Sequence, residues 1–495
     1  MKKTHQKGIY NCNNNIDTQP NIGCYIWLGK WYPYSELTGI RLILFLVIIS
    51  ALQLSCDDFV EVPQPNSQLT RVTVFEDKAT ANAALAATYA KLRENGLLAG
   101  TTSGLSHQLG NYTDELTYFG NPLNTSLTFY NNTLRASDRE LANLWNNSYN
   151  QIYAANAILE GIQQSKSLTE ATKNEFMGEA IFIRALLHFY LGNLYGSIPY
   201  ITTTDYRQNA KVSKKELSDV YVLIQNDLKQ AIRLLPEAYS TEDRVRPNKA
   251  VAHALLARLS LYARAWNDAA DEASLVINNT ELYTWNSNLD AEFLKGSTAT
   301  IWQLISGVDG KNTEEGITFI FTSGPPPSSA LSNNLMAAFA PNDLRKTHWI
   351  GTVTSGLSSW FYPKKYKKSQ YTGSSVEYSI LFRLAEMYLI RAEARVYQNN
   401  LEGAKEDLNK VRLRAGLSET TANTAPEIID AVLQERRFEF FTELGHRFFD
   451  LKRTNTIDQA LAPVKPGWDT KDKLFPIPDS ELLLNPNLKP QNYGY

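Results

Sequence analysis

VRPNKAVAHALLARLSLYARAWNDAA (Val245–Ala270) contains two short segments of helix-forming composition separated by a brief turn. Apolar and small residues recur at helical spacing in Asn248–Ala263, and Trp266–Ile277 continues the pattern. Three small side chains, at Ala257, Ala269 and Ala273, are spaced by 12 and then 4 positions. Small residues at such positions allow two helices to pack closely, so this stretch predicts a helix–turn–helix pair.

A second stretch repeats the same spacing. Ala392, Ala404 and Leu408 lie in two further predicted helices, Ile380–Gln398 and Glu402–Ala415. This spacing is typical of the tetratricopeptide repeat, but the copies lie 135 residues apart (392 minus 257), whereas a plain array repeats about every 34 residues. We therefore predict a mainly α-helical, tetratricopeptide-like superhelix that is interrupted by a large insertion.

The remaining chain divides into helical and irregular parts. Other helices are predicted at Lys78–Asn95, Leu141–Ile162, Thr172–Leu194, Glu216–Leu235 and Ala425–Glu443. The insertion, residues 278–379, instead contains short β-like runs (TATIWQLIS and GITFIF) and a GPPP turn at Gly324–Pro327. Long loops on a rigid scaffold commonly carry binding sites, so we expect the ligand site in this insertion or in the irregular stretch at residues 96–132.

Composition excludes several functions. The 49 basic and 51 acidic residues nearly balance, which gives no basis for nucleic-acid binding. None of the six histidines forms HExxH or HxH, and the chain has no Walker A, GxSxG or GxGxxG motif. We therefore expect no cofactor and no metal.

The N-terminal part resembles a secretion signal. Leu42–Leu52 (LILFLVIISAL) is apolar but shorter than the roughly 20 residues of a membrane-spanning helix. Ser55–Cys56 then resembles the lipobox of bacterial lipoproteins, although Gln53 stands where Leu is usual. Because the chain is free of cysteine after Cys56, a disulfide or thiolate metal site within the folded body is excluded. We predict a signal peptide with an atypical N-terminal extension at residues 1–55 and a lipid-anchored tether at 56–77.

Two acidic clusters suggest catalysis, and each has a structural alternative. Glu443–Arg453 (ELGHRFFDLKR) resembles an acid/base cluster, but its neighbouring phenylalanines favour a buried ion-pair network that anchors the last helix. Asp114 and Glu115 could form the carboxylate pair of a glycosidase. Since adjacent side chains usually point apart and the sequence suggests no second acid for either of them, we predict that the protein is not an enzyme.

Aromatic residues give the better functional signal, because flat rings stack on the apolar C–H faces of sugars. The alternative for each residue is packing in a small core. The candidate ligand-binding residues are Tyr112, Tyr118, Trp285, Trp302, Trp349, Trp360 and Tyr362.

Several long motifs resemble one family in the order in which they occur. They are GEAIFIRALLHFYLGNLYGSIPY (Gly178–Tyr200), RLAEMYLIRAEA (Arg383–Ala394), ERRFEFFTELGHRFFDLKR (Glu435–Arg453) and LFPIPDSELLLNPNLKPQNYGY (Leu474–Tyr495). From them the chain is identified as a member of the SusD/RagB family of outer-membrane lipoproteins of Bacteroidota, with a SusD-like N-terminal region at 78–240 and a RagB/SusD C-terminal region at 241–495.

The resemblance implies a function. It implies four tetratricopeptide-like units, an irregular ligand-binding face, and a SusC-like TonB-dependent outer-membrane transporter as partner. The lipoprotein would capture an oligosaccharide, or alternatively a peptide, and deliver it for import without catalysis. Cys56 would carry the acyl chains, such as palmitate, that hold the protein on the outer membrane. Asp57 and Asp58 would act as the export signal that directs it to the cell surface.

Overall fold

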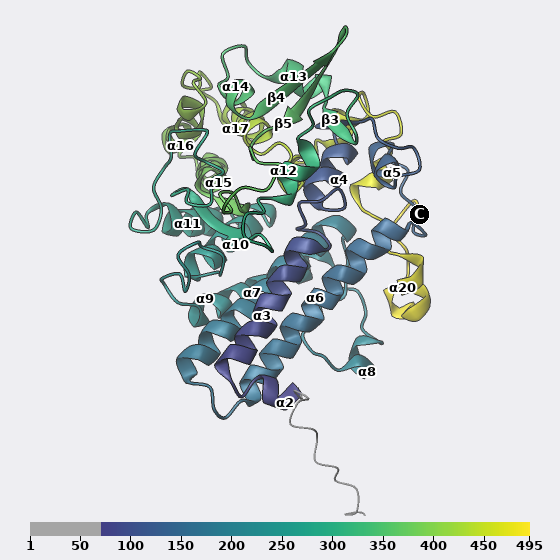
Figure 1. The fold of residues 1–495 in the computed structure, drawn as a ribbon, viewed down its shortest axis with the longest axis vertical. Coiled ribbons are helices and arrows are strands. Elements are labelled where there is room, and N and C mark those ends of the chain that lie inside the picture. Colours follow the sequence, from purple (N-terminus) through teal and green to yellow (C-terminus); the bar gives the residue numbers. More distant parts are fainter. Residues whose placement is uncertain (1–70) are drawn as a thin grey trace, which may run out of the picture. The chain divides into compact units, whose positions relative to one another are not determined.

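Long α-helices form the scaffold of the chain (Figure 1). The computed structural model describes residues 71–495, all of which belong to one compact unit. The predicted signal peptide, Cys56, Asp57 and Asp58 lie outside the described residues. The division into regions at 78–240 and 241–495 remains a prediction.

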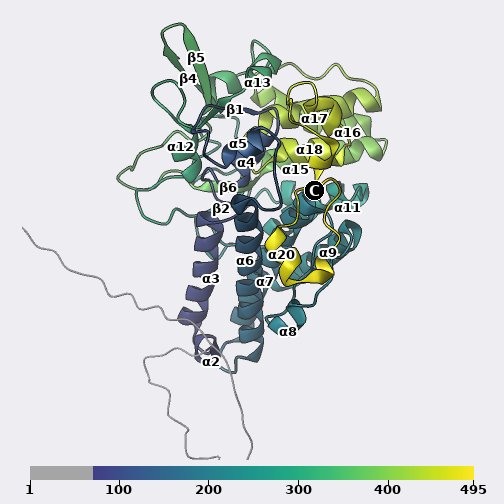
Figure 2. The same cartoon turned by 90° about the vertical axis from the view of Figure 1, so that its right-hand side faces the viewer.

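The first half of the scaffold is a layer of packed helices. α3 (Lys78–Glu94) packs on α6 (Arg139–Gln164), α6 on α7 (Glu170–Tyr195), and α7 on α9 (Leu217–Leu234) (Figure 2). These helices confirm the sequence predictions to within a few residues at each end. α7 is apolar almost all round, and nearly all of its residues from Gly178 onward are buried between its neighbours.

The two repeats form adjacent helical hairpins. α10 (Lys249–Tyr262) pairs with α11 (Trp266–Ile277), and α15 (Leu384–Tyr397) pairs with α16 (Leu401–Arg414). Because α11 also packs on α15, the hairpins are neighbours in space despite their separation in sequence. The six spacing residues are fully buried, as predicted: Ala257, Ala269, Ala273, Ala392, Ala404 and Leu408. α17 (Ala425–Glu439) continues the stack against α15 and α16.

One predicted helix boundary is wrong because the residues there form a buried two-stranded sheet. The predicted helix Ile380–Gln398 begins only at Leu384, because β6 (Ser379–Arg383) pairs antiparallel with β2 (Thr300–Leu304). Both strands are buried at every position, so burial on both faces outweighs the helical pattern there. The run TATIWQLIS is thus a strand, as predicted.

The run GITFIF was predicted as a strand, and that prediction is wrong. It forms most of α12 (Glu314–Phe319). The side chain of Thr313 accepts a hydrogen bond from the backbone N–H of Gly316, and two glutamates occupy the first turn. An N-cap followed by acidic residues stabilises a helix start, and this local signal outweighs the β-branched composition.

A second sheet has the strand order β1–β3–β5–β4. It consists of β1 (Leu116–Tyr118), β3 (Ser329–Leu331), β5 (Ser358–Pro363) and β4 (Ile350–Ser355). The sheet therefore joins the irregular stretch at 96–132 to the insertion, at the end of the unit opposite α2 (Arg71–Val74) (Figure 1). β4 and β5 form a hairpin whose turn contains Gly356 at φ +60, a conformation that glycine adopts without strain.

Shorter elements complete the unit. They are α4 (Leu105–Tyr112), α5 (Ser126–Tyr130), α8 (Tyr206–Asn209), α13 (Asn333–Ala338), α14 (Arg345–His348), α18 (His446–Arg453), α19 (Ile457–Leu461), η1 (Thr470–Lys473), α20 (Asp479–Leu484) and η2 (Pro486–Leu488). Within residues 71–495, no helix has the length and apolar content needed to cross a bilayer.

Candidate ligand-binding site

Three of the seven candidate aromatic residues lie in hydrophobic cores. Tyr112, Trp302 and Trp349 are buried. The hydroxyl of Tyr112 donates to the carbonyl of Asp472 at 3.1 Å. The indole nitrogens of Trp302 and Trp349 donate to backbone carbonyls at 3.3 and 2.9 Å. These three residues pack in cores, which was the alternative considered for each of them. They offer no ring face to a ligand.

Trp360 and Tyr362 lie on the face of the four-stranded sheet that points away from the core. Leu331 pairs with Phe361, and both pack in the core beneath the sheet. Since side chains alternate along a strand, Trp360 and Tyr362 on either side of Phe361 point to the opposite face. Both are partly exposed.

Phe119 extends this face beyond the end of β1. Its backbone N–H donates to the carbonyl of Ser328 at 2.7 Å and so continues the pairing of β1 with β3. By the same alternation its ring points to the side of Trp360 and Tyr362, and it is 42% exposed. We call Phe119, Trp360 and Tyr362 the aromatic sheet face. Phe119 was not among the seven candidates, because its exposure depends on this long-range pairing.

The insertion holds the two rings of β5 in place. Phe321 packs against Tyr362 with ring centroids 5.1 Å apart. A Cβ atom at Gly324 would lie 2.0 Å from the Trp360 ring, so the backbone of the GPPP turn rests directly on the indole. The rings are therefore fixed before a ligand arrives.

Tyr118 lies at the sheet edge but on the other face. It pairs with Ser329 and has the same orientation as Leu116, which belongs to the core. Its hydroxyl donates to the carbonyl of Asn121 at 2.9 Å, and its ring centroid lies 6.5 Å from that of Tyr130. The structure thus brings Tyr118 onto the same sheet as Trp360 and Tyr362 but not onto their face.

Trp285 lines a separate pocket of about 670 Å³. Its indole is packed against the Arg414 guanidinium at 4.3 Å and against the edge of Tyr388. The remaining lining combines the polar residues Asn286, Ser287, Ser297 and Thr298 with the apolar residues Ala291, Leu294 and Val376. None of the sheet residues lines this pocket, so it forms a second, independent candidate region.

Asp114 and Glu115 do not form a catalytic pair. Asp114 accepts two hydrogen bonds of 2.9 Å from Arg447 and one of 2.8 Å from Arg437. Burial favours a raised pKa for Asp114, but these two arginines hold it below its ordinary value. Glu115 instead accepts from the backbone N–H of Thr442 at 3.3 Å, and burial, with the nearby Asp114 charge, raises its pKa to about 8. The two carboxylates have different partners, as expected for adjacent residues.

The cluster at Glu443–Arg453 belongs to a buried ion-pair network, as predicted. Arg383 contacts both Glu439 and Glu443. Asp450 pairs with Arg436 at 2.8 Å and so links α18 to α17. Among residues 71–495, no group of three or more His, Cys, Asp or Glu side chains is placed to hold a metal ion.

Comparison with known protein families gives two matches. The model described as "Starch-binding associating with outer membrane" matches residues 58–261, and the model described as "SusD family" matches residues 336–495.

Known proteins and solved structures agree with these matches. The chain is 27% identical over 382 residues to "SusD-like protein P2" of Formosa agariphila, covering 65% of this chain and 74% of that protein. It is 25% identical over 430 residues to "Starch-binding protein SusD" of Bacteroides thetaiotaomicron, covering 68% and 75%. A solved "Laminarin binding SusD-like protein" superposes with a TM-score of 0.71 at 23% identity, over 85% of this chain and all of that one. A SusD homolog from Bacteroides thetaiotaomicron gives a TM-score of 0.73 at 18% identity, over 86% and 98%.

The first matched segment covers the helical layer and the first helix of the first repeat, and the second covers the second repeat with the C-terminal motifs. The helical-repeat scaffold with small inserted sheets is the fold of the superposed structures. The chain belongs to the SusD family.

Proposed function

We propose that the protein is a non-catalytic, cell-surface lipoprotein that binds an oligosaccharide and delivers it to a SusC-like TonB-dependent transporter. The description of the first family model, starch binding in association with the outer membrane, supports this proposal. So do the names of a starch-binding relative and of a laminarin-binding structural neighbour.

The aromatic sheet face is the observation that carries the proposal. Phe119, Trp360 and Tyr362 come from segments about 240 residues apart and share one face of the sheet. Aromatic rings bind the apolar faces of sugar rings, and polar groups nearby read the hydroxyls. Because Phe321 and Gly324 hold the rings in position, little side-chain entropy is lost on binding.

The test is calorimetric titration of the purified protein with oligosaccharides prepared from starch and from laminarin, and with mixed peptides as the competing ligand class. We expect saturable binding of at least one oligosaccharide and no release of shorter sugars. Binding of peptides alone would favour the peptide-carrier alternative. Turnover of a bound glycan by the purified protein would contradict the non-catalytic assignment.

The Trp285 pocket serves as an internal comparison in this test. If the oligosaccharide binds there instead, Trp285→Ala will weaken binding while Trp360→Ala will not. That result would keep the glycan-binding function but move the site.

The anchor and the partner complete the proposal. Acylated Cys56 would hold the protein on the outer membrane, and Asp57 and Asp58 would direct it to the exterior. Co-purification of the transporter with the lipoprotein from solubilised outer membranes would support the partner assignment, and its absence from such preparations would count against it.

A further inference from the structure

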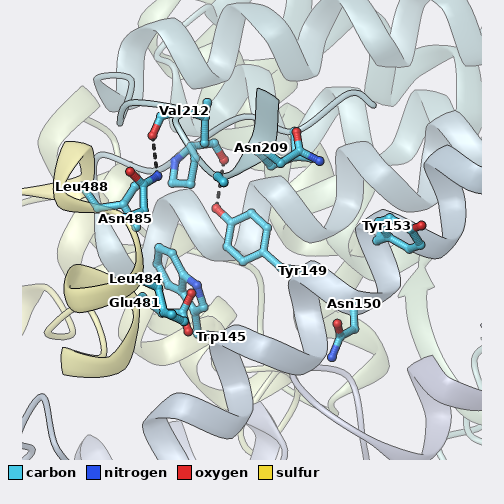
Figure 3. A pocket seen from close by; sticks show the side chains of 13 residues that line it. Trp145, Tyr149, Asn150, Tyr153, Asn209, Val212, Glu481, Leu484, Asn485 and Leu488 are labelled. Atoms are coloured by element: carbon cyan, nitrogen blue, oxygen red, sulfur yellow. Dashed lines mark hydrogen bonds between the residues drawn. The ribbon is translucent and has the colours of Figure 1, made fainter. Parts of the chain in front are cut away.

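A second cavity, apart from both candidate glycan regions, lies beside the C-terminal segment of the chain. It encloses about 400 Å³ between α6, residues 199–212, and the turns α20 and η2 (Figure 3). The lining residues are Trp145, Tyr149, Asn150, Tyr153, Pro199, Ile201, Asn209, Ala210, Val212, Glu481, Leu484, Asn485 and Leu488.

One wall of this cavity is a row of aromatic rings. Trp145, Tyr149 and Tyr153 are spaced four residues apart on α6, so they lie on one face of the helix. The rings of Trp145 and Tyr149 are 4.9 Å apart, and the Tyr149 hydroxyl donates to the carbonyl of Pro199 at 2.9 Å. Tyr153 is 49% exposed. The first two rings are thus fixed, and the third is open to solvent.

The opposite wall is joined to the scaffold by hydrogen bonds. The side-chain amide of Asn485 donates to the carbonyl of Val212 at 2.8 Å (Figure 3). The side-chain amide of Asn487 donates to the carbonyl of Lys211 at 2.8 Å. Lys214 donates to the carbonyl of Pro490 at 2.6 Å. These bonds hold the cavity open between segments that are distant in sequence, so a ligand would enter a preformed site.

Most polar groups in the lining already have partners. The amide of Asn485 donates to Val212 and accepts from the backbone of Asn487, and the amide nitrogen of Asn209 donates to the carbonyl of Thr203. A sugar with many hydroxyls would find few free donors here, whereas the apolar walls of Val212, Leu484 and Leu488 favour an apolar body.

The carboxylate of Glu481 is the one charged group that lines the cavity, and it accepts a hydrogen bond from the Ser480 hydroxyl at 3.4 Å. It lies beside Trp145 (Figure 3), whose indole N–H donates to it. No Lys or Arg lines the cavity, so Glu481 faces it without a cationic partner among the lining residues. Burial raises the pKa of Glu481, which reflects the cost of a carboxylate held against apolar surroundings.

We propose that this cavity binds a small organic ammonium compound with an apolar body. The ammonium group would pair with the Glu481 carboxylate and contact the electron-rich face of Tyr149, which lies one helical turn from Trp145. The apolar body would pack on Val212, Leu484 and Leu488. This site and its ligand class do not depend on the glycan-binding function.

The test compares charged and neutral ligands of the same shape. Full-length mature protein is titrated with benzylamine, benzyltrimethylammonium and benzyl alcohol by calorimetry or ligand-observed NMR. We expect both ammonium compounds to bind at least tenfold more tightly than benzyl alcohol. Glu481→Gln should abolish that preference, because the amide keeps the size and the acceptor for Trp145 but lacks the charge.

Two further variants make the outcome unambiguous. Glu281→Gln, at an exposed glutamate outside the cavity, should leave the preference unchanged. Tyr149→Leu should weaken binding of the ammonium compounds severalfold, because it removes the ring face that the ammonium group contacts. Equal affinity for charged and neutral ligands, or a preference that survives Glu481→Gln, would overturn the proposal. Displacement of benzylamine by laminarin oligosaccharides would assign the cavity to sugars instead.

Discussion

Asp114 and Arg447 share two hydrogen bonds of 2.9 Å although they are 333 positions apart in sequence. Asp114 lies two residues before β1, and Arg447 lies in the first turn of α18. The pair therefore fixes the base of the four-stranded sheet to the C-terminal motif of the chain. It gives that motif a structural role in positioning the aromatic sheet face.

Asp114→Asn should destabilise the protein strongly. The change would remove the carboxylate that Arg447 and Arg437 share. Removing one partner of a buried ion pair commonly costs about 3–5 kcal/mol, because the remaining charge stays buried without compensation. Urea unfolding at neutral pH measures the loss.

The pH dependence of this effect has a definite sign. The pKa of Asp114 is lowered in the folded state, so its stabilising effect is present above the ordinary Asp pKa and is lost as pH falls through the lowered value. The difference between wild type and variant should therefore shrink in acid. Asp268→Asn, at an exposed position, is the matched control and should change stability little.

Glu115→Gln should change how stability depends on pH in the opposite direction. Burial raises the pKa of Glu115 to about 8, so between about pH 4.5 and pH 8 the folded state keeps a proton that the unfolded state loses. Stability of the wild type should fall across this window by up to about 1.4 kcal/mol per pH unit from this group. The glutamine variant should lack this contribution to the slope. An unchanged slope from pH 5 to pH 8 would show that Glu115 is ionised in the folded protein.

Trp349→Phe should lower stability without weakening glycan binding. Trp349 is buried, and its indole N–H donates to the carbonyl of Leu289, so the change removes packing and a hydrogen bond. We expect a loss of about 1–3 kcal/mol in chemical unfolding with an unchanged dissociation constant. A tenfold weaker affinity in a folded variant would place Trp349 in the binding site.

Cys56→Ala should release the protein from membranes. Several acyl chains on one residue give firm attachment. Alanine has no thiol to carry them, and the chain has no cysteine after Cys56. Fractionation of cells that produce wild type and variant measures the change. A variant that remains in the membrane fraction would contradict the anchor assignment, and Ser55→Ala serves as a neighbouring control.

Local patterns were sufficient to predict most of the scaffold. The helical period of Trp266–Ile277 and the small residues of both repeats predicted the hairpins because helices depend on contacts close in sequence. Ile380–Arg383 was assigned wrongly because it pairs with β2, a strand distant in sequence. GITFIF was assigned wrongly because the Thr313 cap begins a helix there.

The candidate site was harder to predict for the same reason. Trp302, Trp349 and Trp360 are all tryptophans within one insertion, yet two are buried and one is partly exposed. Trp302 lies in β2, which is buried at every position, Trp349 follows α14 and lies in a core, and Trp360 lies on the outer face of β5. These surroundings depend on strand partners that lie up to 215 residues apart in sequence. Composition alone cannot separate a core ring from a binding ring.

The most direct test of the central claim is the affinity of the Trp360→Ala variant for an oligosaccharide that the wild type binds. Calorimetry should show at least a tenfold weaker dissociation constant, because truncating an aromatic anchor of a binding face commonly costs about 2 kcal/mol or more and tenfold corresponds to about 1.4 kcal/mol. Tyr493→Ala, at a 92% exposed tyrosine in the C-terminal segment, should bind like the wild type. Equal affinity of the wild type and Trp360→Ala would contradict the claim that the aromatic sheet face is the glycan-binding site.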